Sequence, residues 1–249
     1  MGVREHVDMA NRRVERRNNS SGRATREHII LVAEALFAER GIEGVSLREI
    51  GQAAGQRNNA ATQYHFGDRA GLVAAIVGHR ATRNDPMRQV LLEEIAHRGE
   101  ISLDEVVAAL VVPVVEHVAE PGNHYVGFLD RWYSSSRKYG QPIIPGPESP
   151  AMDEIACLLR RCLPELPTEV VDRRLTIAVL WMVRSLAAYE RAVIANQQVQ
   201  PLNEVTDELI VMLAGAIGAP VLERAGVDIA EGPGRTRARG SPKAPAEPR

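Results

Sequence analysis

Residues 57–63 concentrate side chains that can hydrogen-bond to the edges of nucleobases. The run combines guanidinium, amide and hydroxyl groups, on Arg57, Asn58, Asn59, Thr62 and Gln63. Asparagine and glutamine amides can pair bidentately with adenine, and an arginine guanidinium can pair in the same way with guanine. On an ordinary surface helix such residues are simply solvated, so their interpretation depends on the elements that carry them.

Short helices with a tight turn are predicted around this run. An apolar face at helical spacing predicts a first helix over residues 25–40, formed by Ile29, Val32, Ala33, Leu36 and Phe37. A capping-box pattern predicts a second helix over residues 46–54. A third is expected over residues 58–66, and Asp68 is expected to cap a fourth over residues 69–80. This order is typical of a helix-turn-helix, whose recognition helix enters the major groove of DNA.

The spacing of apolar, glycine and aromatic residues here resembles the DNA-binding domain of the TetR family of bacterial regulators. The matching segments are Thr25-Arg26, Ala35 to Gly41, Ser46 to Ile50, Ala54-Gly55, Tyr64 to Arg69, and Leu72. The resemblance implies an all-α protein. A helix-turn-helix domain (residues 24–80) is expected to precede a larger helical domain (residues 81–231) that binds an effector and dimerises.

The resemblance also implies DNA contacts outside the run of residues 57–63. Ser46 and Arg48, at the start of the second helix, are expected to touch phosphates or base edges. Tyr64 and His65, at the end of the third helix, are expected near backbone phosphates. Arg69 occupies the position of a frequent phosphate-binding lysine, and Arg26 completes the predicted DNA-binding residues.

One departure from the family pattern affects this set. Eight residues separate Gly55 from Tyr64, one more than the family spacing, so it stays open which of Asn58, Asn59 and Ala60 face the bases. Family members often carry an aromatic residue at the position of Gln63. A phosphate contact there is therefore either absent or made by the amide.

Charge is distributed unevenly along the chain. Residues 1–80 hold 12 arginines and 9 acidic residues, a net charge of +3, whereas residues 81–232 hold 13 basic and 22 acidic residues, a net charge of −9. This gradient favours a polyanionic partner for the N-terminal third alone. Residues 1–23 are expected to form a disordered basic arm, which either contacts the minor groove of DNA or is a solvated run of charges. Residues 232–249 predict a second disordered tail.

The larger domain is predicted to be helical at residues 84–98, 103–119, 124–138, 150–162, 168–197 and 203–217. The helix over residues 168–197 carries an apolar stripe wide enough for burial on two sides. In the TetR family the last two helices pair across a two-fold axis. We therefore expect a homodimer interface on residues 168–197 and 203–217, and a palindromic double-stranded DNA operator.

A ligand-binding site is expected inside this domain, lined by Phe128, Trp132, Tyr133, Trp181, Arg184 and Tyr189. Apolar walls with a few polar groups are typical of small-molecule sites, although aromatic side chains equally fit a plain core. Arg184 lies in an apolar stripe and needs a partner, which is either a ligand carboxylate or an internal acid. The sequence does not identify the effector.

Other classes of protein find little support. The sequence has no phosphate-cradling glycine loop and no nucleophile elbow, so no enzyme activity and no cofactor are expected. Cys157 and Cys162 lack partners at metal-ligand spacing, so no metal site is expected and their role stays open. No apolar run reaches the roughly 20 residues of a membrane span, and the N-terminus does not resemble a signal peptide. A cytoplasmic location is expected.

The resemblance thus implies a DNA-binding transcriptional regulator, a repressor released by a small hydrophobic effector that tilts the fourth helix. Gly71 and Gly78 in that helix would ease bending, unless they serve only packing. Two alternatives stay open. One is an activator or ligand-independent regulator gated by a protein partner, and the other is a helical small-molecule-binding protein or enzyme that retains the motif.

Overall fold

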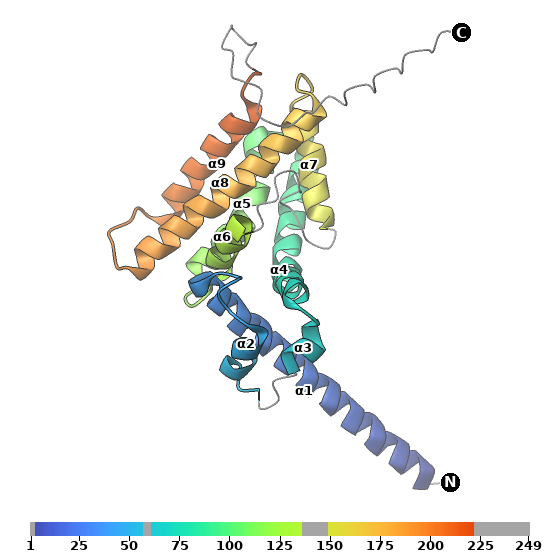
Figure 1. Cartoon of the computed structure of the whole chain (residues 1–249). Coiled ribbons are helices and arrows are strands. Elements are labelled where there is room, and N and C mark those ends of the chain that lie inside the picture. Colours follow the sequence, from blue (N-terminus) through green and yellow to red (C-terminus); the bar gives the residue numbers. More distant parts are fainter. Residues whose placement is uncertain (1–2, 57–60, 136–148, 222–249) are drawn as a thin grey trace, which may run out of the picture. The chain divides into compact units, whose positions relative to one another are not determined.

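The protein is helical throughout the part that the structure describes. The computed structural model describes residues 3–56, 61–135 and 149–221, and for residues 3–21 and Ala61 it describes the backbone only. These residues contain helices and no strand (Figure 1), which confirms the all-α class. The helices are α1 (Val3–Arg40), α2 (Leu47–Ala53), α3 (Ala61–Phe66), α4 (Arg69–Arg98), α5 (Leu103–Ala119), α6 (Tyr125–Ser135), α7 (Pro150–Cys162), α8 (Thr168–Ile194) and α9 (Leu202–Gly218).

The helices α1 to α3 are separated by the breaks that the sequence predicts. Gly41, Gly55 and Gly67 follow α1, α2 and α3, and each has a positive φ, a conformation that side-chain-bearing residues rarely adopt. The apolar face of α1 packs on α2, α4 and α6 through buried residues that include Ile29, Phe37 and Ile50. The C-terminal part of α1 thus forms a small core with its neighbours, and the contacts of α3 with α2 and α4 fix the direction of α3.

Helix α4 is longer than predicted. Asp68 caps its start by accepting a hydrogen bond from the backbone N–H of Gly71 at 2.8 Å, and the helix continues through Pro86 to Arg98. The predicted end near Arg80 is wrong, because a proline removes one helical hydrogen bond without stopping a helix that packs on both sides. The boundary predicted between residues 80 and 81 falls inside α4, and residues 1–219 form one compact unit.

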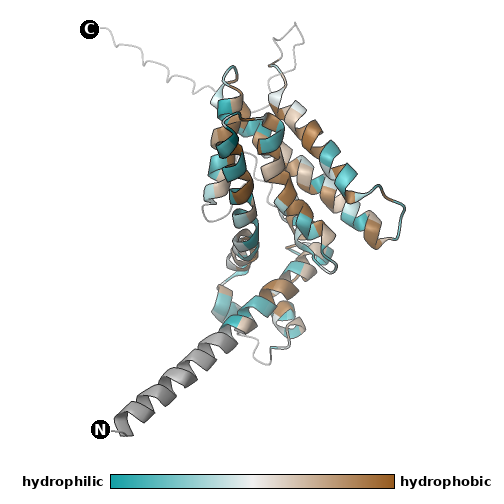
Figure 2. Cartoon of the chain, turned by 180° about the vertical axis from the view of Figure 1, so that it is seen from behind, coloured by the Kyte–Doolittle hydropathy of each residue, from teal (hydrophilic) through white to brown (hydrophobic). Residues whose placement is uncertain are grey.

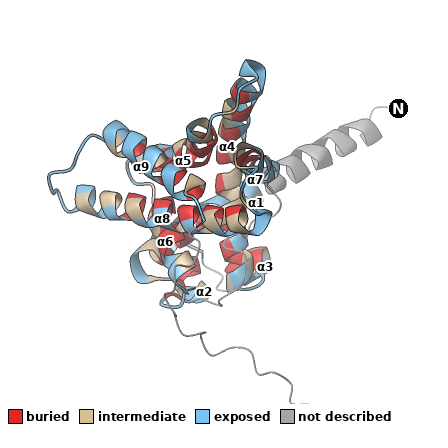
Figure 3. Ribbon diagram, turned by 90° about the horizontal axis from the view of Figure 1, so that it is seen from above, coloured by how far each residue is buried: buried red, intermediate tan, exposed pale blue. Residues whose placement is uncertain are grey.

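Helix α5 is the centre of the larger helical layer. It contacts α4, α6, α7, α8 and α9, and it is apolar nearly all round, as expected for a helix surrounded by others. The surrounding helices are amphipathic, with hydrophobic and hydrophilic residues alternating along each ribbon (Figure 2). Buried residues gather where α4, α5 and α8 face one another (Figure 3).

The two predicted disordered ends have different outcomes. The structure differs from the predicted arm over residues 1–23, because α1 begins at Val3 and runs without interruption to Arg40. Residues 3–19 contain no proline or glycine and several good helix formers, so the helix of the domain can extend backwards through them. The predicted tail, residues 232–249, lies outside the described residues.

Candidate nucleic-acid interface and internal cavity

The outer face of α3 presents the side chains expected of a recognition helix. Tyr64 is 86% exposed, which is unusual for a large aromatic residue, and Gln63 is exposed beside it. The ring of half-buried His65 packs edge-on against Tyr64, with 5.4 Å between centroids. The predicted residues Gln63, Tyr64 and His65 therefore lie together on a face that the protein does not use for its own packing.

Thr62 is on the opposite face, which corrects its prediction as a DNA-binding residue. It is fully buried, and no described residue hydrogen-bonds to its hydroxyl. It packs against Gly51 of α2, where an added Cβ would come within 2.9 Å of Thr62 Oγ1. Thr62 thus sets the close approach of α2 and α3, and its polarity misled the interpretation because helical spacing alone does not say which face is buried.

Ser46 and Arg48 lie at the start of α2, as predicted, but they present different groups. The Ser46 hydroxyl accepts a hydrogen bond from the Glu49 N–H at 3.2 Å, and the Ser46 backbone N–H donates to Glu49 Oε2 at 2.8 Å, which completes a capping box. The hydroxyl also donates to Glu49 Oε2 at 2.7 Å. Hydrogen bonds from Ser46 and from Arg40 lower the pKa of Glu49 to about 2, so the box stays ionised. Ser46 orients the helix, whereas exposed Arg48 is free to reach a phosphate.

Two further arginines border this surface. The guanidinium of Arg26 on α1 lies 5.1 Å from the centre of the Phe66 ring, so its charge is held beside the end of α3. Arg69 donates to Glu43 Oε2 at 2.6 Å and to the carbonyl oxygen of Val45 at 3.1 Å. Its role here is to tie α4 to the loop before α2. The remaining predicted base-reading residues, Arg57, Asn58 and Asn59, lie outside the described residues.

A partly open cavity of about 90 Å³ lies between α4, α5, α6, α7 and α8. The described part of its lining is mostly apolar, with a polar strip on α4. The lining residues are Val77, Ala81, Asn84, Asp85, Arg88, Leu110, Val114, Tyr125, Leu129, Trp132, Tyr133, Ser149, Met152, Val179, Met182 and Val183. The cavity therefore contains two of the six residues predicted for the ligand site, Trp132 and Tyr133.

The other four predicted ligand-site residues lie elsewhere. Phe128 is fully buried in the core and stacks between Phe37, Tyr125 and Trp132. Trp181 is 40% exposed on the outer face of α8, and Tyr189 donates from its hydroxyl to the carbonyl of Gln200. A helix of this length has room for both an inner and an outer apolar stripe, so the sequence could not assign Trp181 to one of them.

Arg184 is also outside the cavity, and its partner is an internal acid. Its side chain is 65% exposed and donates two hydrogen bonds to the buried carboxylate of Asp130, at 2.7 and 2.9 Å. Arg191 donates to the same carboxylate at 3.1 Å. Of the two predicted partners, the internal acid is therefore the one found, and Asp130 joins α6 to α8.

A second cavity, of about 190 Å³, lies towards the C-terminal end of α4. Its lining includes Leu92, Ile95 and Leu158, together with two charged residues, Glu154 and Arg161. It shares no lining residue with the first cavity. The first cavity is the better candidate for a ligand that acts on α3, because it borders the segment of α4 that lies nearer to α3.

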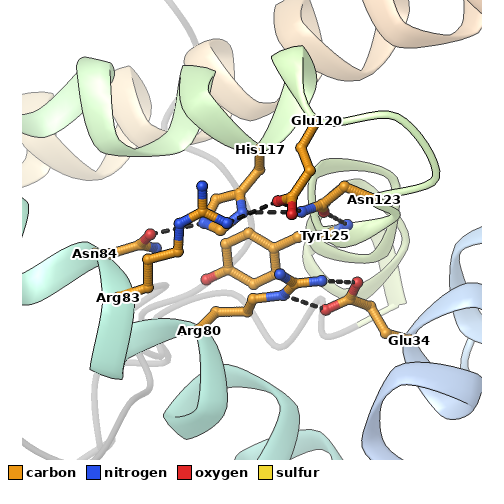
Figure 4. Close-up of polar contacts among 8 residues, drawn as sticks. All are labelled: Glu34, Arg80, Arg83, Asn84, His117, Glu120, Asn123 and Tyr125. Carbon is orange, nitrogen blue, oxygen red and sulfur yellow. Dashed lines mark hydrogen bonds and ion pairs between the residues drawn. The ribbon is translucent and has the colours of Figure 1, made fainter.

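A buried polar network joins α1 to the first cavity (Figure 4). Arg80 of α4 donates to both carboxylate oxygens of Glu34 on α1, at 2.7 and 2.5 Å, and both side chains are buried. The Arg80 guanidinium lies 5.6 Å from the centre of the Tyr125 ring, which lines the cavity. One ion pair thus contacts both the first helix and a wall of the cavity.

His117 of α5 extends this network. Its Nε2 donates to Asn84 Oδ1 at 2.7 Å and its Nδ1 accepts from Asn123 at 3.1 Å, which requires a neutral ring. Asn123 and Arg83 both donate to Glu120. Burial, together with the positive charges of Arg80 and Arg83, lowers the pKa of His117 to about 4.

Comparison with known proteins identifies both parts of the chain. Residues 29–76 match the family model "Bacterial regulatory proteins, tetR family", and residues 108–216 match "Tetracyclin repressor-like, C-terminal domain". The chain belongs to the TetR family. It is therefore a DNA-binding transcriptional regulator with an N-terminal helix-turn-helix and a helical C-terminal domain.

Two individual TetR-family relatives can be compared over most of their length. The HTH-type transcriptional regulator AcrR from Shigella flexneri is 25% identical over 222 residues, which are 83% of this chain and 96% of that protein. A TetR-family transcriptional regulator from Rhodococcus sp. aligns in three dimensions with a TM-score of 0.38 and 18% identity. That alignment covers 78% of this chain and 97% of that one.

Other predicted features of this TetR-family protein concern metals, membranes and thiols. No helix among the described residues is long and apolar enough to cross a membrane. The described residues contain no group of three or more potential metal ligands. Cys157 is exposed and Cys162 half-buried, neither is in a disulfide, and burial raises the pKa of the Cys162 thiol.

The low pKa of His117 predicts a pH-dependent contribution to the stability of this TetR-family fold. In the unfolded chain the ring titrates near 6.5, so between pH 6.5 and 4 the unfolded state binds more protons. The histidine's contribution is complete above pH 6.5 and is lost as the pH falls to 4. Urea titrations are expected to show a contribution of roughly 3 kcal/mol that His117→Gln lacks.

A carboxylate whose pKa is shifted in the opposite direction must be taken into account in this measurement. Burial raises the pKa of Glu190 from 4.5 to about 7, so its contribution is present below pH 4.5 and is lost as the pH rises to 7. The two slopes oppose each other in the wild-type protein. The contribution of His117 to the free energy of unfolding must therefore be taken from the difference between His117→Gln and wild type. Glu190→Gln measures the opposing contribution of Glu190 in the same way. Equal slopes for His117→Gln and wild type would contradict the prediction.

Sequence reasoning missed the residues that connect the two parts. No sequence motif marks Glu34, Arg80, Asn84 or His117, because each is a common polar residue type. The signal that was available is the position of Glu34 beside the apolar face of α1, between Ala33 and Leu36, where a charged side chain needs a buried partner.

Proposed function

We propose that this TetR-family regulator is a homodimeric repressor that leaves a palindromic operator when a small molecule occupies the cavity between α4 and α8. The observation that carries the proposal is the placement of α4. Only two residues separate this helix from α3, and its next turns line the cavity through Val77, Ala81 and Asn84. A ligand that displaces α4 therefore displaces the recognition helix as well.

The ion pair between Glu34 and Arg80 supports transmission of that displacement. Arg80 contacts Tyr125 in the cavity wall and holds Glu34 on α1 through two hydrogen bonds. A ligand that moves Tyr125 or α4 strains a bidentate contact which tolerates little displacement. The ligand changes operator affinity only to the extent that it binds the two arrangements unequally.

The outer face of α8 and α9 supports a dimer. Large apolar side chains are exposed there, among them Ile177, Trp181, Val211 and Met212. Arg173 is exposed beside them on α8 and several acids are exposed on α9, so two copies related by a two-fold axis can bury the apolar residues and align opposite charges. This face contains the two segments predicted for the interface.

The operator test uses the purified full-length protein. Genomic DNA fragments are selected by binding, and the affinity of the enriched fragments is measured at two salt concentrations. We expect a palindromic site with a steep salt dependence. Tyr64→Ala is expected to weaken binding about tenfold at every sequence, as loss of a phosphate contact does. Gln63→Ala changes sequence preference if the amide reads a base.

The control for this test is Gln197→Ala, which changes an exposed amide beyond the end of α8. It is expected to bind as the wild type does. Weak binding without sequence preference, unchanged by Tyr64→Ala, would show that α3 is not the recognition element. If transcription from the regulated promoter rises when the protein binds, the protein is an activator and not a repressor.

A charge placed on the proposed dimer face is expected to separate the subunits. Trp181→Asp and Val211→Asp introduce a carboxylate that the interface would have to bury unpaired. Sedimentation equilibrium is expected to show a monomer and operator binding is expected to fall, because one half-site alone is bound weakly. Val90→Asp, on the exposed side of α4, is the control. A dimer that survives both α8 and α9 substitutions would place the interface elsewhere.

A further inference from the structure

One wall of the α4–α8 cavity is polar, and it is built from one turn of α4. Asn84, Asp85 and Arg88 line it, with Ser149 facing them from the start of α7. Arg88 is only 7% exposed. A guanidinium buried to this extent needs partners for its five N–H groups.

Among the described residues, the hydrogen bonds of this wall leave donors without acceptors. Asp85 Oδ1 accepts from Arg88 Nη1 at 3.0 Å and from the Ser149 hydroxyl at 2.9 Å. Arg88 Nε is buried and donates to no described residue. Asn84 accepts from His117 through Oδ1, and none of the described side chains accepts from its amide nitrogen.

Two phenols add to the same excess of donors. Tyr125 and Tyr133 both line the cavity, and neither hydroxyl is hydrogen-bonded to a described residue. Burial raises the pKa of Tyr125 to about 12 and also raises that of Tyr133, so both hydroxyls keep their protons. The side chains of the wall thus offer several donors from which no described residue accepts, while Oδ1 of their one carboxylate already accepts two hydrogen bonds.

The rest of the lining is apolar. Leu110, Val114, Leu129, Val179 and Val183 face the polar wall across the cavity. The volume of about 90 Å³ is smaller than an engineered cavity of about 150 Å³ that binds benzene, so the occupant is small or displaces half-buried Trp132 and Met152. A ligand that suits both walls has a polar head that only accepts hydrogen bonds and a short apolar body.

We propose that the α4–α8 cavity binds a small monocarboxylate, whose head accepts hydrogen bonds from Arg88 and Asn84 and whose apolar chain lies against α5 and α8. The inference rests on the proposed function, because it takes this acid to be the effector that releases the operator. A carboxylate supplies acceptors only and matches the planar fork of a guanidinium. A single negative charge suits the wall better than two, because Asp85 already neutralises part of the charge of Arg88.

Direct binding to the full-length protein tests the chemical class. Straight-chain acids from butyrate to decanoate are titrated calorimetrically, with the matching primary amides and amines as neutral and cationic probes. At least one acid is expected to bind at least about tenfold more tightly than its amide, and the amine not at all. Binding is expected to raise the melting temperature by a similar increment for each tenfold increase in acid concentration above Kd.

The variants are chosen so that Asp85 is not left without a partner. Asp85→Asn with Arg88→Gln removes both charges of the pair, and the preference for acid over amide is expected to disappear. Arg160→Gln, which changes an exposed arginine paired with Asp172, is the control and is expected to keep the preference. The proposal is overturned if no acid binds, if acid and amide bind equally to the wild type, or if the double variant keeps the preference.

Operator affinity measured with the same probes separates this inference from the proposed function. An acid that binds with the expected preference but leaves operator affinity unchanged supports the chemical class and contradicts the effector role. An amide that binds as well as the acid and releases the operator supports the effector role and overturns the class.

Discussion

Replacing Arg80 with methionine is expected to lower the free energy of unfolding by about 3–5 kcal/mol, because it leaves the carboxylate of Glu34 buried and unpaired. Glu34 is 1% exposed and receives two hydrogen bonds from this guanidinium. Water cannot replace the lost donors without opening the contact between α1 and α4. Urea denaturation of the full-length protein at neutral pH measures the loss.

The companion double variant distinguishes a buried charge from a lost contact. Glu34→Leu with Arg80→Met replaces the ion pair by apolar side chains of similar size, and such replacements are often neutral. We expect most of the stability to return, with a coupling energy that a double-mutant cycle measures directly. A double variant as unstable as Arg80→Met alone would show that the pair acts through packing on Tyr125 instead.

The same double variant tests how the cavity communicates with α3. It keeps α1, α4 and Tyr125 but removes the directional contact between them. Operator affinity without ligand is expected to stay within about threefold of wild type, whereas release by a bound effector is expected to weaken, since coupling free energies of this kind are about 1–3 kcal/mol. Full release by the effector would exclude the ion pair from the transmission path.

Periodicity and capping explain why the helices could be predicted from the sequence. The stripe from Ile29 to Phe37 has only one helical face to bury, and the pattern from Ser46 to Glu49 is a local signal complete within four residues. The end of α4 could not be predicted in this way. Pro86 is tolerated because α4 packs along its length against α5 and α7, and that packing is not visible in a local window.

The two candidate sites also differ in whether local sequence or long-range packing determines them. The exposed face of α3 follows from the helix-turn-helix pattern, so Gln63 and Tyr64 were predicted, and Thr62 was misassigned because its neighbour Gly51 lies on another helix. The cavity depends on which faces of five helices meet. Aromatic content indicated Trp132 and Tyr133, but Arg88, on a stretch rich in charge, gave no sign that it is buried. Long-range packing decides such cases.

Gly71→Ala is expected to lower the free energy of unfolding by about 2–3 kcal/mol, which is the second large effect expected in the N-terminal part. A Cβ built there overlaps the carbonyl oxygen of Phe66, the last residue of α3, and it also lies 3.5 Å from Asp68 Oδ1. Backbone atoms at the junction of α3 and α4 cannot move aside as a flexible side chain can. Gly71 therefore serves the close approach of the two helices and not the bending of α4 suggested by its residue type.

Gly78 on the same helix is the matched control. A Cβ at this position meets nothing within 4 Å, so Gly78→Ala is expected to stabilise α4 by about 0.5–1 kcal/mol through helix propensity alone. Thermal and urea denaturation are expected to show opposite signs for the two alanines, and operator affinity is expected to fall only for Gly71→Ala, since only that change displaces α3. If both alanines stabilise the protein and leave operator affinity intact, the junction is looser than this geometry requires, and α3 is not positioned by the first turn of α4.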